Sequence, residues 1–174
     1  MIQDKYDVQA CFPNNVIALL GFCAREIDRG TDDDPVAGDG IRIVYRTVRT
    51  TDRTETLSIT AGHWTPEEDS KELGGAEPTL QRYTVNVESL VVDMDEERGI
   101  QTHSYLSTLV RHLLYRDPAL QAAMPALSVT VGGYTESLKR WGINQQAFLN
   151  NKVGQSFVFL SSVELWFETD IKNP

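Results

Sequence analysis

The feature that most constrains the fold of this chain is a change of apolar spacing between residues 80 and 115. In "LQRYTVNVESLVVD" (residues 80–93) the side chains of Tyr83, Val85 and Val87 recur at every second position, which predicts a strand with one buried face. The opposite face is largely polar, and a sheet that exposes one face to water is antiparallel or mixed. From Ile100 onward the apolar spacing becomes three and four residues, which predicts an amphipathic helix.

An acidic turn joins this strand to this helix. Asp93, Asp95, Glu96 and Glu97 form part of a metal or acid–base site, or they serve to begin the helix. Carboxylates at a helix N-terminus accept hydrogen bonds from unpaired N–H groups and interact favourably with the helix dipole. The two histidines of the helix are nine residues apart and therefore lie on opposite sides, which disfavours a shared metal ion. We expect an acidic cap rather than a metal site.

The N-terminal part is predicted to form a helix and a hairpin. Apolar residues recur at helical spacing over residues 13–29, with Asn14 or Asn15 available as the N-cap. Alternation over residues 41–46 and again over 55–61 predicts two strands, and the short polar turn between them predicts a hairpin.

The C-terminal part is predicted to extend the sheet. "ALQAAMPAL" after the long helix is expected to be a short helix or a turn, and "LSVTV" a short strand. The aromatic-rich "SFVFLSSVELWFET" is expected to be a long strand that pairs with residues 128–131 or with residues 80–93. The predicted fold class is α+β: a mostly antiparallel or mixed sheet packed against one long amphipathic helix, with an N-terminal helix, in a single domain over residues 1–174.

Two long loops are expected within this domain, at residues 65–78 and 132–155. The first, "TPEEDSKELGGAEP", is polar and acidic, and loops of this length in compact domains are usually functional or disordered. The second is rich in Gly, Asn and Gln but contains Trp141 and Phe148. These aromatic side chains either anchor an interface or pack onto the protein's own sheet, and the sequence leaves both interpretations open.

Charge excludes one class of function. The net charge is −9, from 25 acidic and 16 basic residues, so a general nucleic-acid-binding protein with a basic stripe is not expected. The one basic region is the predicted hairpin, with Arg42, Arg46, Arg49 and Arg53. This region is either a solvated strand face or a contact surface for an acidic neighbour.

Familiar catalytic and cofactor motifs are missing from the sequence. It contains no glycine-rich dinucleotide or nucleotide-binding motif, no H-E-x-x-H and no G-x-S-x-G. Cys11 and Cys23 stand twelve residues apart without a third ligand nearby, and we interpret them as structural thiols. No cofactor, metal or enzymatic activity is therefore predicted. No membrane span or secretory signal is apparent either, which is typical of a protein made in a cytoplasm.

Two segments resemble a known family. "LQRYTVNVESLVVDMDEERGIQTHSYLSTLVRHLLY" and "VGQSFVFLSSVELWFETDI" are similar to the tail terminator proteins of long-tailed bacteriophages, particularly those of actinobacterial hosts. In that family such a strand runs through an acidic turn into the helix, and a long aromatic-rich strand ends the chain. The resemblance covers roughly the C-terminal half, with the N-terminal helix and hairpin compatible with it.

The resemblance implies a non-enzymatic part of a virion tail or neck, assembled in the host cytoplasm. Such proteins form a hexameric ring that stops polymerisation of the tail-tube protein and presents a surface to a head-completion or connector protein, while DNA passes through the lumen without specific binding. The interface residues would then be Arg42, Arg46, Arg49, Arg53, Trp141 and Phe148, and an acidic loop containing Glu67, Glu68, Asp69 and Glu72 would face the lumen.

Other functions remain open at this point. A head-to-tail adaptor or stopper, or a tail-tube subunit, would have a related assembly role. A protein of another class, an acidic metal-dependent enzyme or nuclease, would use Asp93, Asp95, Glu96 and Glu97.

Overall fold

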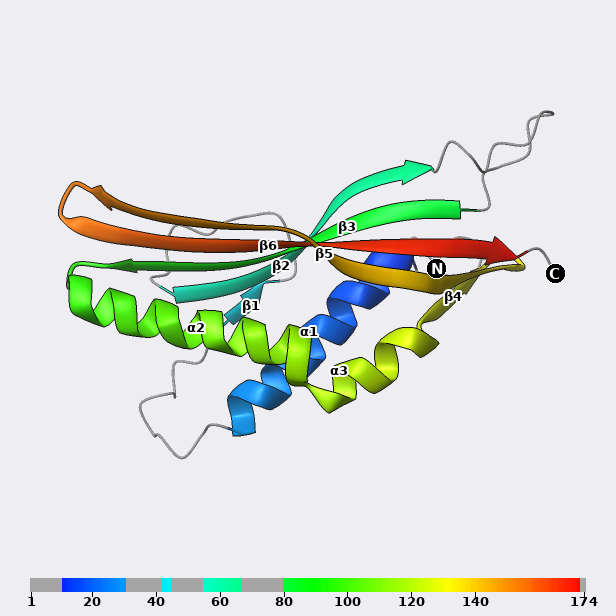
Figure 1. Cartoon of the computed structure of the whole chain (residues 1–174), viewed down its shortest axis with the longest axis horizontal. Coiled ribbons are helices and arrows are strands. Elements are labelled where there is room, and N and C mark those ends of the chain that lie inside the picture. Colours follow the sequence, from blue (N-terminus) through cyan, green and yellow to red (C-terminus); the bar gives the residue numbers. More distant parts are fainter. Residues whose placement is uncertain (1–10, 31–41, 45–54, 67–79, 173–174) are drawn as a thin grey trace, which may run out of the picture.

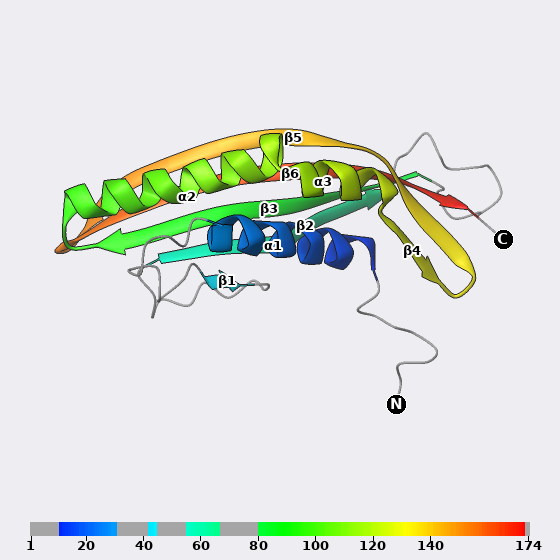
Figure 2. The same cartoon turned by 90° about the horizontal axis from the view of Figure 1, so that it is seen from below.

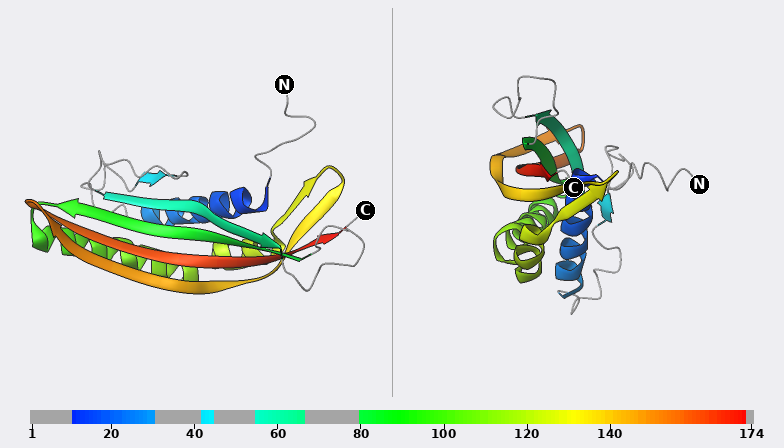
Figure 3. Two further views of the ribbon diagram at one scale, coloured as in Figure 1. Left: turned by 90° about the horizontal axis from the view of Figure 1, so that it is seen from above. Right: turned by 90° about the vertical axis from the view of Figure 1, so that its right-hand side faces the viewer.

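The protein is an α+β fold of two layers, with helices on one face of a single sheet. The computed structural model describes residues 11–30, 42–44, 55–66 and 80–172. Within these residues the sheet has six strands in the order β1-β2-β3-β6-β5-β4. The helices α1, α2 and α3 all lie on the same face, and no described element covers the other face (Figures 1 and 3). The predicted fold class is therefore confirmed.

The elements follow the chain in a simple order. They are α1 (Phe12–Gly30), β1 (Arg42–Val44), β2 (Glu55–Pro66), β3 (Leu80–Asp93), α2 (Glu96–Arg116), α3 (Pro118–Ala123), the 3₁₀ turn η4 (Met124–Ala126), β4 (Ser128–Val131), β5 (Tyr134–Val153) and β6 (Ser156–Lys172).

Three long antiparallel strands form the centre of the sheet. β6 pairs with β3 along its length, from Leu80 opposite Asp170 to Asp93 opposite Phe157, and with β5 on its other side. Pairing of the closing strand with residues 80–93 is thus confirmed, whereas the 128–131 strand pairs with β5 instead.

The predicted hairpin is wrong. β1 pairs with β2 in parallel, with Ile43 opposite Leu57, whereas a hairpin requires antiparallel strands. Both segments are strands, as their alternation indicated, and the residues between them lie outside the described part of the chain. β2 instead pairs antiparallel with β3, its sequence successor.

The core lies between the helices and the covered face of the sheet. In α1, Val16, Leu20 and Cys23 are buried on the face that the spacing predicted. They pack with Val85 of β3 and Leu165 of β6 in one cluster. The helix begins at Phe12, one residue before the predicted start, so Asn14 and Asn15 lie inside its first turn rather than at the N-cap position.

The long helix begins and ends at aspartates. The Asp95 carboxylate accepts a hydrogen bond from the Arg98 N–H at 3.1 Å, which makes Asp95 the N-cap of α2, as the acidic turn predicted. Asp117 ends α2 and also caps α3, where its carboxylate accepts from the Leu120 N–H at 2.9 Å and Pro118 follows as the first residue. Residues 116–118 therefore end one helix and begin the next without an intervening loop.

The long loop predicted for residues 132–155 is also wrong. Residues 134–153 form β5, the longest strand of the sheet, between two tight turns (Figure 2). Gly132 and Gly133 have φ of 60° and 90°, a conformation that suits a two-residue hairpin turn and that other residues adopt at a cost. The other predicted loop, at 65–78, begins at the last two residues of β2; residues 67–78 lie outside the described part of the chain.

Candidate assembly interface

Among the described elements, none pairs with the outer edge of β5 over most of its length. β4 pairs only with Tyr134 to Ser137, and the Leu138 N–H donates to the Leu127 carbonyl at 3.1 Å. Beyond Arg140, residues 141–153 have β6 on one side and no described strand on the other. Every residue from 144 to 153 is exposed. An edge of this kind presents unpaired N–H and C=O groups to any other extended chain.

A groove runs beneath this edge, between β5 and α2. Its floor is apolar and consists of Val110 and Leu114 from the helix with Val163 from β6, and Phe148 forms part of its wall. The hollow has a volume of about 360 Å³. A second hollow of about 460 Å³ shares Leu114 and Tyr115 and continues the groove toward Trp141.

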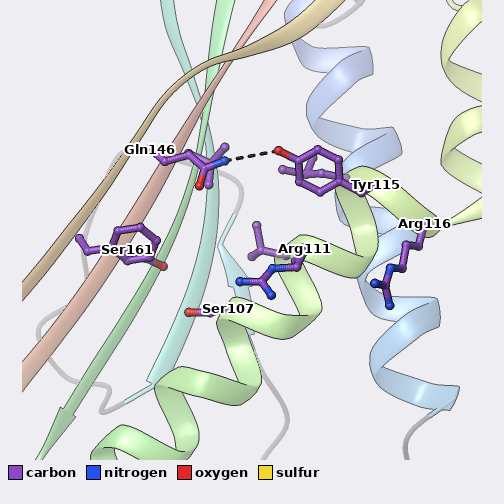
Figure 4. Close-up of a pocket in the computed structure, with 10 residues that line it drawn as sticks. Ser107, Arg111, Tyr115, Arg116, Gln146 and Ser161 are labelled. Atoms are coloured by element: carbon purple, nitrogen blue, oxygen red, sulfur yellow. Dashed lines mark hydrogen bonds between the residues drawn. The ribbon is translucent and has the colours of Figure 1, made fainter.

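The polar groups of the groove come mainly from one side of α2. Figure 4 shows Arg111 and Tyr115 projecting from the helix beside the strands, with the Tyr115 hydroxyl accepting from Gln146 Nε2 at 3.4 Å. The Ser107 hydroxyl is buried beside the groove and has no hydrogen-bond partner among the residues that the structure describes. Arg111 and Arg116 are the charged residues of the lining, which contains no carboxylate. The groove is therefore locally cationic in a chain of net charge −9.

Trp141 and Phe148 both line this groove and its continuation, but they differ in exposure. Trp141 is half-buried, stacks on Phe167 of β6 at a centroid distance of 6.0 Å and packs against the core. Phe148 is 71% exposed at the mouth of the groove. Of the two open interpretations, packing on the protein's own sheet describes Trp141, whereas Phe148 keeps the exposure that an interface residue needs.

Of the other predicted interface and lumen residues, the structure describes only Arg42. Arg42 is the first residue of β1, at the opposite edge of the sheet from β5. Arg46, Arg49 and Arg53 lie outside the described residues, as do the four acidic residues Glu67, Glu68, Asp69 and Glu72.

The acidic turn before α2 is held by local hydrogen bonds. Arg98 donates from Nε to one Asp93 oxygen at 2.7 Å and from Nη2 to the other at 2.6 Å. These bonds, with the Asp95 N–H donating at 2.9 Å, lower the pKa of Asp93 to about 2. Asp93 and Asp95 thus have structural partners, and the described residues contain no group of three acidic, histidine or cysteine side chains placed to hold a metal ion.

A second charged cluster lies on the open face of the sheet, where no described helix covers it. Glu168 is 3% exposed although it carries a carboxylate, and Arg140 Nη2 lies 2.7 Å from it. Lys139 and Arg82 approach the same carboxylate at 3.6 Å and 3.7 Å. The Arg140 hydrogen bond is the main cause of the lowered pKa of Glu168. The Arg82 and Arg140 guanidiniums also lie over the Trp166 ring, at 5.4 Å and 5.7 Å from its centroid.

The sequence did not identify the groove. Arg111 and Arg116 follow no motif, and in a helical pattern they read as ordinary solvated positions. The sequence offers only an indirect indication of the groove: two arginines flank the apolar stripe near the end of this amphipathic helix.

Comparison with known proteins adds no family to these observations: no known protein family matches the sequence, and no curated protein matches it. Within the described residues, no helix combines the length and apolar character that a membrane span requires.

Proposed function

We propose that this chain is a structural protein of a bacteriophage tail, a tail terminator. In this proposal six copies form a ring on the end of the tail tube, stop its polymerisation and offer a surface to a head-completion or connector protein. The resemblance of residues 80–115 and 153–171 to tail terminators motivates the identity. The bare edge of β5 is the observation that supports an assembly role.

The β5 edge has the properties of a surface that another chain covers. Monomeric proteins protect such edges with charged residues, prolines or covering segments. Residues 141–153 include one lysine and no proline, and three of their apolar side chains are exposed: Phe148 at 71%, Val153 at 62% and Leu149 at 52%. An added strand would satisfy the backbone groups of the edge and cover these side chains at the same time.

The proposed ring would surround DNA without binding it specifically. Six chains of net charge −9 repel phosphate, which suits a lumen through which DNA slides. The proposed location is the tail or neck of the virion, after assembly in the host cytoplasm. An adaptor, stopper or tail-tube subunit would use the same edge, and the difference between them lies in what they form: a closed ring or an open-ended polymer.

The length of polymerised tail tubes distinguishes these functions. Tail-tube subunits of long-tailed phages from actinobacterial hosts would be polymerised with and without this chain and measured by negative-stain electron microscopy. We expect shorter tubes with a ring at one end. The Phe148→Lys, Leu149→Lys double variant should no longer shorten the tubes. The control Gln155→Lys, which places one lysine in the adjacent turn, should shorten them as the unmodified chain does. Tubes of unchanged length would contradict a terminator, and long tubes formed by this chain alone would indicate a tube subunit.

A further inference from the structure

The start of α2 forms an exposed acidic corner at one end of the molecule (Figure 1). We define the acidic corner as Met94, Asp95, Glu96, Glu97 and Ile100. Met94 is 71% exposed and Ile100 46% exposed, so apolar surface lies directly beside the carboxylates. The side chains of Glu96 and Glu97 are exposed, so their negative charge faces solvent, and Gln101 Nε2 donates to Glu97 at 3.5 Å.

The arginine groove, lined by Val110, Arg111, Leu114, Tyr115, Arg116 and Phe148, has the complementary character. Its floor is apolar and its charges are positive, whereas the corner combines exposed apolar side chains with negative ones. Both surfaces belong to the same helix, but Glu97 and Arg111 are separated by about 20 Å along its axis at 1.5 Å per residue. A chain therefore cannot place its own corner in its own groove.

We propose that the acidic corner of one copy docks in the arginine groove of the next copy. This inference rests on the proposed ring, because it names the surfaces that join neighbouring subunits. The partner is a second copy rather than another protein, since each copy carries both complementary surfaces and contact between acidic chains otherwise meets repulsion. A contact between two different surfaces repeats head to tail and closes when the rotation between copies allows it.

Docking at this place also engages the free edge of β5. The groove lies directly under residues 146–148, so a corner seated there brings the incoming chain beside the unpaired backbone. Arg111 and Arg116 would bind Glu96 and Glu97, and Met94 with Ile100 would cover Leu114 and Phe148. The buried Ser107 hydroxyl, which has no partner within the described residues, lies at the same site.

Two charge-reversed variants test the proposal. The groove variant is Arg111→Glu with Arg116→Glu, and the corner variant is Glu96→Lys with Glu97→Lys. Alone, each variant sets like charges against each other, so we expect the dissociation constant of its assembly to rise about 100-fold or more. Mixed in equal amounts, the two variants restore opposite charges at both kinds of contact, and we expect rings in which the variants alternate at a ratio of 1:1.

Controls separate a failed interface from a failed fold. His112→Glu adds negative charge on the same turn of α2 without lining the groove, and we expect it to assemble as the unmodified chain does. Circular dichroism checks that each variant is folded. A milder variant, Arg111→Gln with Arg116→Gln, removes the charges without reversing them, and we expect it to weaken assembly too.

The possible outcomes discriminate between this inference and the proposed function. If the unmodified chain assembles and both reversed variants assemble equally well, the docking inference is overturned while the ring stands. If only the groove variant fails and mixing does not rescue it, another segment occupies the groove, which also overturns the inference. If the unmodified chain never assembles, alone or on tubes, both the docking inference and the proposed function are contradicted.

Discussion

Arg140 and Glu168 form an ion pair across two neighbouring strands, with 2.7 Å between Nη2 and the carboxylate, on the face of the sheet that no described helix covers. The Glu168 side chain is buried while the Arg140 side chain is 61% exposed. Burial of a carboxylate is unfavourable unless partners compensate it, and Lys139 and Arg82 supply two more. This cluster joins β3, β6 and β5 at the end of the sheet remote from the acidic corner.

We expect Glu168→Gln to lower the free energy of unfolding by about 1–2 kcal/mol. Removing one partner of a fully buried pair costs more, about 3–5 kcal/mol, because it strands the other charge. Here the three cations are at least 42% exposed, so water compensates much of the loss. Urea unfolding at pH 7 measures the change. Glu164→Gln on the same strand is the control, and an equal loss in both variants would contradict a special role for Glu168.

Acid should remove the contribution of Asp93. Its pKa is about 2 in the folded protein, mainly because Arg98 donates two hydrogen bonds, against an ordinary value of 3.8. A lowered folded pKa means that the stabilisation is complete above about pH 4 and is lost as the pH falls toward 2. Asp93→Asn should therefore destabilise the protein at pH 7, with a difference from the unmodified chain that shrinks between pH 4 and pH 2. Unfolding free energies measured across this range test the trend, and a difference independent of pH would contradict it.

Replacing Gly99 with alanine should destabilise the protein although it places a better helix former in α2. The helical preference of alanine over glycine is worth about 1 kcal/mol. A Cβ at this position, however, would lie 2.5 Å from a ring carbon of Phe159, which is itself buried. Overpacking of this kind costs about 1–3 kcal/mol, so we expect a net loss of up to about 2 kcal/mol.

The matched control for this substitution is Ser104→Ala, at an exposed position of the same helix, which should change the stability little or raise it slightly. Thermal unfolding of both variants gives the comparison. A stabilised Gly99→Ala protein would mean that the Phe159 ring moves aside without cost.

The two cysteines should react with iodoacetamide at very different rates. Cys23 is buried in the core, and burial together with a hydrogen bond to Asp117 raises its pKa to about 11. The thiolate is the reactive form, so little of it exists at pH 8. Mass spectrometry should find Cys11, which is partly exposed, modified first, and Cys23 modified only after denaturation. Equal labelling of both in the folded protein would contradict the packing of α1.

Sequence reasoning succeeded where one spacing runs without interruption. The helix from Glu96 to Arg116 buries its apolar stripe from Leu106 to Leu114, although the predicted first member, Ile100, is exposed, and its ends carry the aspartates that cap it. Burial alternates along β3 from Val85 to Asp93 and along most of β6, because each lies between two strands and packs one face on the helices. In such elements the local pattern and the tertiary environment agree.

β5 was missed for a physical reason. Its register against β6 shifts between Leu138 and Arg140 and again between Ile143 and Gln145, and each shift changes which residues face the helices. The apolar side chains Leu138, Trp141, Ile143 and Phe148 therefore lose their alternation. As an edge strand it is also largely exposed, so its composition is that of a loop.

The candidate interface was predictable only in part. Phe148 was singled out because an aromatic residue stood among polar neighbours, and it lies at the mouth of the groove. Arg111 and Arg116 could not be paired with it from the sequence, because the groove exists only where α2 crosses the face of β5 and β6. The parallel pairing of β1 with β2 was likewise invisible, since alternation identifies a strand but not the direction of its partner.

The mass of the purified chain under native conditions tests the assembly role. Native mass spectrometry over a range of concentrations, with sedimentation velocity as a check, would measure it alone and together with tail-tube subunits. A tail terminator with the surfaces described above should give a closed hexamer, six times the 19.5 kDa mass of one chain, and no longer polymer. A monomer at every concentration in both samples would contradict it.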